Sequence, residues 1–190
     1  MRPAPADKAA RPPALRALFR RIRGNRDGAV AIEFAMLAVP FLLLVFSVLE
    51  SCVSFASQQV LANATDEVAR LIRTGQVKAA DVSEAKLKTM ICDRIKIMVA
   101  SGCPDLVVDL REYPTFAAAA QQRIKLTSDK DIDTTGFAVA PGKAMSKNML
   151  RVFYRWPVMT DLMRQSMSNL KGGKTLHFAS VTWQNEPFDD

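Results

Sequence analysis

The feature that most constrains this chain is an apolar run over residues 29–49. At about 1.5 Å of rise per residue, a helix of this length reaches roughly 31 Å, close to the ~30 Å hydrocarbon thickness of a bilayer. The run contains one charged residue, Glu33. The sequence therefore predicts one membrane-spanning helix near the N-terminus.

Glu33 lies about one helical turn inside this predicted span. A carboxylate at that depth is costly, and such groups are usually paired or used for function. The alternative is that Glu33 sits at the headgroup level of an ordinary signal anchor, where it reaches water. The carboxylate alone leaves both interpretations open.

The residues around Glu33 carry a resemblance. Gly28, the four small or apolar residues 29–32, Glu33 and Phe34 resemble the prepilin peptidase site of the tight-adherence pilus system. Residues 28–50 as a whole resemble the TadE-like minor pseudopilins. This resemblance implies cleavage after Gly28, a new N-terminus at Ala29, and a role in pilus assembly. It also implies two kinds of protein partner, a prepilin peptidase and other pilins and pseudopilins of the same apparatus.

The positive charge of the chain is concentrated before the span. Residues 1–28 hold eight of the 26 basic and two of the 19 acidic side chains, a net charge of +6, which leaves +1 for the rest. Basic segments beside a span are retained in the cytoplasm. We therefore expect a cytoplasmic leader at 1–28, an anchor in a bacterial inner membrane whose lipid is a further partner, and a periplasmic C-terminal domain. The same distribution argues against nucleic-acid binding.

Two stretches resemble other export signals. Arg20 and Arg21 suggest a twin-arginine signal, but Asp27 and Glu33 lie where such a signal is uncharged. Residues 49–52 imitate a lipoprotein cleavage box ending at Cys52, although Glu50 beside the cut is atypical. Lipidation of Cys52 stays open as a less favoured alternative.

The helix is expected to continue beyond the membrane as far as Arg73. Pro40 should kink it modestly, and Gly75 supplies a stop signal. Beyond residue 50, apolar residues recur at steps of three and four and predict a buried stripe: Val53, Ala56, Val60, Leu61, Ala64, Val68, Leu71 and Ile72. The predicted helix spans 29–73, followed by an extracytoplasmic domain over 76–190.

A second helix is predicted after residue 81. Asp81 is a candidate N-cap, and the apolar side chains Leu87, Ile91, Ile95 and Met98 follow at helical spacing. Cys92 and Cys103 lie on and just after this helix, in a compartment expected to be oxidising, so a disulfide between them is predicted.

Alternation of period two predicts half-buried strands over 106–111 and 149–156. A last strand over 175–183 shows a phase slip that suggests a bulge near Ala179 and Ser180. A short helix after Pro157 should bury Met159, Met163, Met167 and Leu170 on one face. Residues 121–147 fit either a long loop or a loop with one short strand near 137–139. The expected fold is α+β, a long helix packed on a small domain with a second helix and an antiparallel sheet.

No catalytic set, cofactor motif or metal site is evident in the sequence. The chain lacks the phosphate-binding loop pattern, and zinc is disfavoured because Cys-x-x-Cys is absent and His177 lies far from the cysteines. His177 falls in a predicted strand, where a structural role is expected. We therefore expect no enzyme. The alternatives are an unprocessed single-pass anchor whose domain binds a periplasmic partner, and an extracytoplasmic enzyme or sensor tethered by the same helix.

Overall fold

The computed structural model describes residues 29–188. Contacts divide the chain into two units, which meet between residues 46 and 47. The elements in chain order are α2 (Ala29–Arg73), η2 (Ala79–Asp81), α3 (Glu84–Ile95), β1 (Leu106–Tyr113), α4 (Phe116–Ala120), β2 (Val139–Ala140), β3 (Lys147–Pro157), α5 (Asp161–Met167) and β4 (Lys174–Gln184). This confirms the predicted α+β class, and α2 ends at Arg73 as the sequence predicted.

The sheet has the strand order β2-β1-β3-β4. β1 pairs antiparallel with β3, and β3 pairs antiparallel with β4, from Lys147 opposite Gln184 to Pro157 opposite Lys174. The short β2 runs parallel to β1 through Leu110 and Arg111. The sheet is therefore mixed, whereas the sequence indicated an antiparallel one, because the return of the chain after α4 adds a short edge strand in the same direction as β1.

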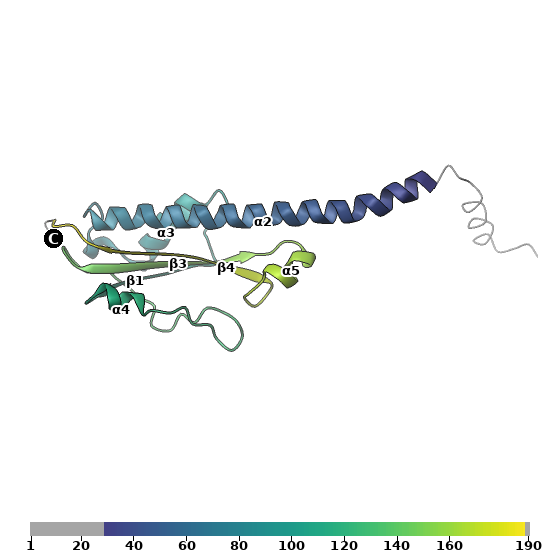
Figure 1. The fold of residues 1–190 in the computed structure, drawn as a ribbon. Coiled ribbons are helices and arrows are strands. Elements are labelled where there is room, and N and C mark those ends of the chain that lie inside the picture. The colour runs from purple at the N-terminus through teal and green to yellow at the C-terminus, as the bar shows by residue number, and fades with distance from the viewer. Residues whose placement is uncertain (1–28, 189–190) are drawn as a thin grey trace, which may run out of the picture. The chain divides into compact units, whose positions relative to one another are not determined.

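One face of the sheet is covered by α3 and the C-terminal half of α2 (Figure 1). Leu61, Val68 and Ile72 from α2 and Leu87, Ile91 and Ile95 from α3 form one core with the even-numbered side chains of β1 and β3. Such burial stabilises the domain by roughly 1.5–3 kcal/mol for each large aliphatic side chain. Gly75, with φ of +72°, follows the helix and takes the left-handed conformation that ends helices with little steric cost.

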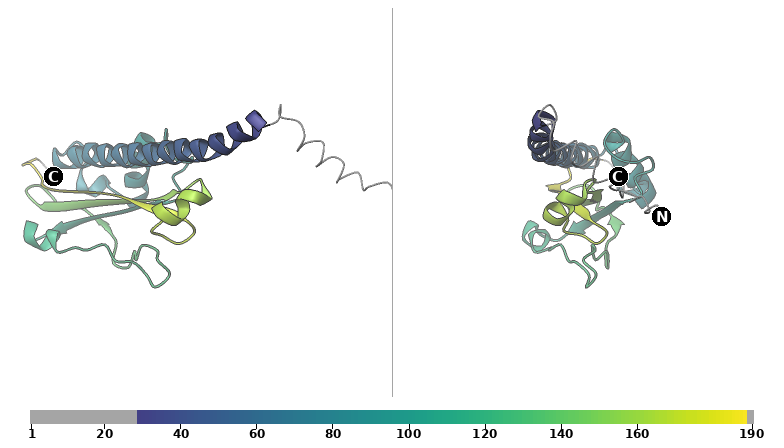
Figure 2. Two further views of the ribbon diagram at one scale, coloured as in Figure 1. Left: turned by 45° about the vertical axis from the view of Figure 1, so that its right-hand side comes forward. Right: turned by 90° about the vertical axis from the view of Figure 1, so that its right-hand side faces the viewer.

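The opposite face is covered by α4 and the segment around β2, as two orientations show (Figure 2). Phe153, Ile132 and Leu170 form a second cluster there with Phe137, Leu176 and Phe178 packed against it. Asp109 and Arg151 are also buried on this face and form an ion pair of 2.6 Å. The prediction of half-buried strands was therefore wrong for β3, which is buried on both faces.

Local details correct two further expectations. The register of β3 and β4 is uninterrupted, so the predicted bulge at Ala179 and Ser180 is absent. The apparent phase slip arises because Leu176 and Phe178 face the second cluster while Ala179 and Trp183 face the first. The N-cap of α3 is Ser83, whose hydroxyl accepts from the Lys86 amide at 3.2 Å, since Asp81 belongs to η2.

Residues 121–147 are mostly loop and contain the two-residue β2. This agrees with the second of the two possibilities that the sequence left open. The predicted buried stripe of α2 holds from Leu61 onward, but Val53 and Ala56 are exposed. Ser54 and Ser57 take their place on the buried side, where both contact His177 of β4.

Candidate membrane span and head attachment site

The first 21 residues of α2 expose their apolar side chains. Phe34 is 72% exposed, and the other large side chains of this stretch are exposed or half-buried. The helix is long and apolar enough to cross a membrane, and its most apolar 18-residue window has no buried share within the described part of the chain. A soluble protein rarely exposes an apolar surface of this extent, so the segment is a candidate membrane anchor.

The predicted processing residues lie at the start of this helix, as far as the structure describes them. Gly28 and the leader lie outside the described residues. Ala29 is the first residue of α2, and Glu33 and Phe34 follow within the next turn and a half, both exposed. An amino group on Ala29 and the Glu33 carboxylate are therefore four residues apart on one helix, the spacing at which side chains are neighbours.

Glu50 follows directly after the apolar run and attaches the helix to the domain. Its carboxylate is 6% exposed and accepts hydrogen bonds from the backbone amides of Met159 and Thr160 and from the Thr160 hydroxyl. These donors stand at the N-terminal end of α5, where amides have no partner within the helix and where negative charge is favourable. Glu50 thus accepts from amides that have no acceptor within the helix, and these donors compensate its buried carboxylate.

One turn further along α2, Ser54 and Ser57 contact His177 of β4. Ser54 Oγ lies 3.1 Å from Nε2 and Ser57 Oγ lies 3.1 Å from Nδ1. The imidazole is 4% exposed and stacks on Trp156 with a centroid distance of 5.2 Å. Both ring nitrogens have partners, as expected for a structural histidine. This also explains why serines occupy the buried side of α2 here.

The hydrogen bonds determine the tautomer of His177. The Ser57 hydroxyl donates its single proton to the Ser54 carbonyl at 2.8 Å, so Ser57 Oγ can only accept from Nδ1–H. Nε2 then accepts from the Ser54 hydroxyl. Burial lowers the pKa of His177 to about 4, because the charged imidazolium would lose its hydration. The residue is therefore neutral at physiological pH.

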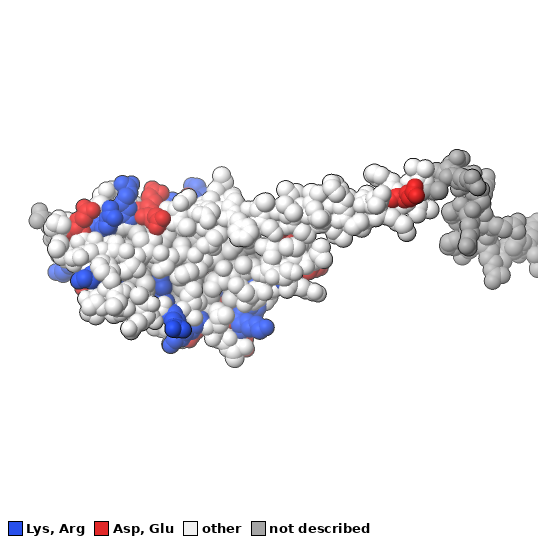
Figure 3. Space-filling model, in the orientation of Figure 1, with Lys and Arg blue, Asp and Glu red and all other residues white. Residues whose placement is uncertain are grey.

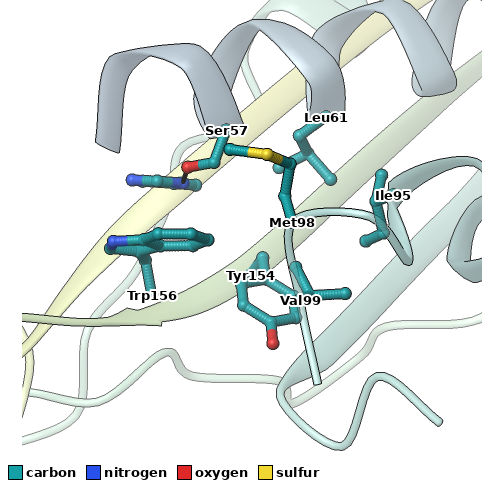
Figure 4. Close-up of a pocket in the computed structure, with 8 residues that line it drawn as sticks. Ser57, Leu61, Ile95, Met98, Val99, Tyr154 and Trp156 are labelled. Atoms are coloured by element: carbon teal, nitrogen blue, oxygen red, sulfur yellow. Dashed lines mark hydrogen bonds between the residues drawn. The ribbon is translucent and has the colours of Figure 1, made fainter. Parts of the chain in front are cut away.

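Serine and histidine side chains in contact also suggest nucleophilic catalysis, but the surroundings do not suit it. The adjoining cavity, lined by Leu61, Met98 and Tyr154 among others, has a volume of about 10 Å³ (Figure 4). This volume holds about one water molecule and leaves no room for a substrate. The described partners of the His177 ring are serines and a tryptophan, without the carboxylate that orients the base of a triad.

The cysteines divide into a bonded pair and a single thiol. Cys92 and Cys103 form a disulfide with their Cα atoms 5.9 Å apart. Cys52 is free and exposed on α2. Across residues 29–188 no cluster of three or more His, Cys, Asp or Glu residues is arranged to hold a metal ion.

Sequence reasoning missed the attachment residues Glu50, Ser54 and Ser57. Their partners lie more than 100 residues away along the chain, and no local pattern pairs positions at that distance. The available signals were indirect. Polar residues interrupt the apolar face of an otherwise regular helix, and a Thr-Asp pair suited to a helix start follows Pro157.

Within residues 29–188, the long exposed apolar helix is consistent with a membrane anchor, and a small α+β domain follows it. The sequence model of the family described as TadE-like protein matches residues 28–70, so the chain is similar to this family over most of its long helix. This confirms the resemblance predicted from Gly28, Glu33 and the following apolar residues. No curated protein and no solved structure matches the chain.

Proposed function

We propose that this chain is a minor pseudopilin of the tight-adherence pilus apparatus, processed by a prepilin peptidase after Gly28 and required for pilus assembly. The observation that carries this proposal is Glu33, the one charged side chain in the first 21 residues of α2, placed five residues after Gly28. The family match that begins at residue 28 supports it. The partners are the peptidase and other pilins and pseudopilins.

The proposal assigns a place to each part of the chain. Residues 1–28 form a cytoplasmic leader, residues 29–49 cross the inner membrane, and the domain over 76–190 lies in the periplasm. The distribution of charge supports this orientation, because the basic excess precedes the span. An oxidising periplasm also suits the Cys92–Cys103 disulfide. The contacts of Glu50, Ser54 and Ser57 attach the domain to the helix, which fits a structural component.

The role of Glu33 follows from the chemistry of the cut. Cleavage after Gly28 releases an ammonium group on Ala29, four residues from the Glu33 carboxylate. Opposite charges that neutralise one another in lipid cost far less than either charge alone. The pair forms within one subunit or between neighbouring subunits, and in the second case it fixes the axial register of packed helices.

The test compares substitutions at Glu33 in cells that assemble the pilus. We expect Glu33→Ala to be inserted in the membrane but to reduce incorporation of the processed chain and the number of pili. Ser47→Ala, a polar change nearer the other end of the apolar run, is the matched control and should leave assembly unchanged. Normal incorporation of Glu33→Ala would refute the pairing role.

A further inference from the structure

Two large apolar side chains at the start of α5 face solvent. Met159 is 65% exposed and Leu162 is 55% exposed, whereas Val158 is 4% exposed. Met159 lies two residues before the first residue of α5, and Leu162 is the second residue of that helix. Met159 was expected in the core from the sequence, and its exposure is therefore a departure that requires an explanation.

The position of α5 along α2 suggests what covers this surface. Glu50 holds the amides at the start of α5, and Ser51 Oγ lies 3.8 Å from Met167 Sδ at its end. Both ends of α5 thus lie against the two residues that directly follow the apolar run 29–49. At about 1.5 Å of rise per residue, these contacts lie within roughly 3 Å of the end of that run along the helix axis.

We propose that α5 rests on the membrane surface, with Met159 and Leu162 inserted at the boundary between lipid headgroups and acyl chains. This position of α5 requires that residues 29–49 are anchored in a bilayer, and it does not require cleavage after Gly28. If Leu49 ends the span, α5 is held at the depth of the headgroups by Glu50. Short amphipathic helices bury their apolar side chains at this depth.

The charges near α5 are compatible with such a surface. Asp161, which lies between Met159 and Leu162 in the sequence, forms an ion pair of 2.6 Å with Arg164. The pair has no net charge, so the carboxylate does not oppose the approach of lipid phosphates. Leu49 and Val53, which flank Glu50 on α2, are also exposed and extend the apolar surface from the span toward the domain.

The opposite end of the sheet supplies a matched control. Figure 1 shows α4 and α5 at opposite ends of the sheet, and β3 runs between these ends. At about 3.3 Å per residue, the 11 residues of β3 span roughly 36 Å. Phe116 on α4 is an exposed apolar residue at this far end and should remain in water.

The experiment uses the full chain with Cys52→Ser, reconstituted in phosphatidylcholine vesicles at a low ratio of protein to lipid. Leu162→Cys, Phe116→Cys and Leu42→Cys are each labelled with an environment-sensitive fluorophore. We expect blue-shifted emission and quenching by spin-labelled lipid at positions 162 and 42, and water-like emission at 116. Met159→Cys is a second variant of the same surface and should behave like position 162.

The labels at 162 and 159 test the docking of α5, whereas the label at 42 tests the membrane span. Water-like emission at 162 and 159 with a lipid-buried label at 42 would overturn the docking of α5 and leave the span intact. Water-like emission at 42 as well would refute the span. A blue shift at 162 that disappears as the protein is diluted in lipid would mean that a second copy covers the surface, and this would also overturn the proposal.

Discussion

The carboxylate of Glu50 accepts the backbone amide of Thr160 at 3.2 Å, although 110 residues separate the two in sequence. This contact joins the residue after the apolar run of α2 to the start of α5. Farther along α2, charged side chains gather at the C-terminal end of the helix (Figure 3). The polar contacts of Glu50, Ser54 and Ser57 therefore attach the domain to α2 nearer the apolar run, away from this charged end.

We predict that Glu50→Ala destabilises the domain by about 2–3 kcal/mol, because it removes the charged acceptor of the Met159 and Thr160 donors at the start of α5. Urea unfolding of the detergent-solubilised chain, followed by the fluorescence of the buried Trp156 and Trp183, measures this loss. Asp161→Asn is the control, since its ion pair with Arg164 is exposed and should contribute less than about 1 kcal/mol. Equal effects of the two substitutions would contradict the role given to Glu50.

The stability of the domain should depend on the protonation of His177. Above pH about 6.5 the imidazole is neutral in both the folded and unfolded chains, so it adds no pH dependence. Below this pH the unfolded chain binds a proton that the folded chain resists until about pH 4. Stability should therefore fall through this window, by up to about 3 kcal/mol at its lower end.

Urea midpoints at pH 7.5, 6 and 5 test this prediction. Carboxylates with a lowered pKa, such as Asp131, titrate mainly below this pH range in the folded chain. His177→Phe removes the titrating group and should give midpoints that are nearly equal over these three pH values. An unchanged slope in His177→Phe would show that another group causes the pH dependence.

Loss of the Cys92–Cys103 disulfide should destabilise the domain by about 3 kcal/mol, given the short loop that it closes. The double substitution Cys92→Ser and Cys103→Ser should therefore lower the urea midpoint of the oxidised protein. A reducing agent should lower the midpoint of the native chain by a similar amount and should leave the variant unchanged. Cys52→Ser is the control, because this exposed thiol is outside the bond.

The buried ion pair on the second face of the sheet should be sensitive to the loss of one partner. Asp109 accepts from Arg151 Nε at 3.0 Å and Nη2 at 2.6 Å, and from Arg111 Nη2 at 3.1 Å. Arg151→Met should cost about 3–5 kcal/mol because it leaves a buried carboxylate poorly compensated. Arg111→Met should cost clearly less, since Arg111 is partly exposed. The reverse order in urea unfolding would contradict this assignment.

The sequence was informative where the physical signal is local. The apolar run, the periodicity up to Arg73 and Gly75 together predicted α2, and alternation predicted β1 and β3. The contacts of Glu50 and His177 depend on tertiary packing between distant segments, and local patterns do not contain this information. The predicted bulge near Ala179 was wrong for a related reason. Alternation along one strand does not reveal that both faces of the sheet are covered.

The most direct test of the proposed function is the intact mass of the chain extracted from membranes of cells that express the prepilin peptidase. The account predicts a chain that begins at Ala29, and a Gly28→Leu variant that keeps residues 1–28. A native chain that retains its first 28 residues would contradict processing and would leave an unprocessed membrane anchor with an α+β domain.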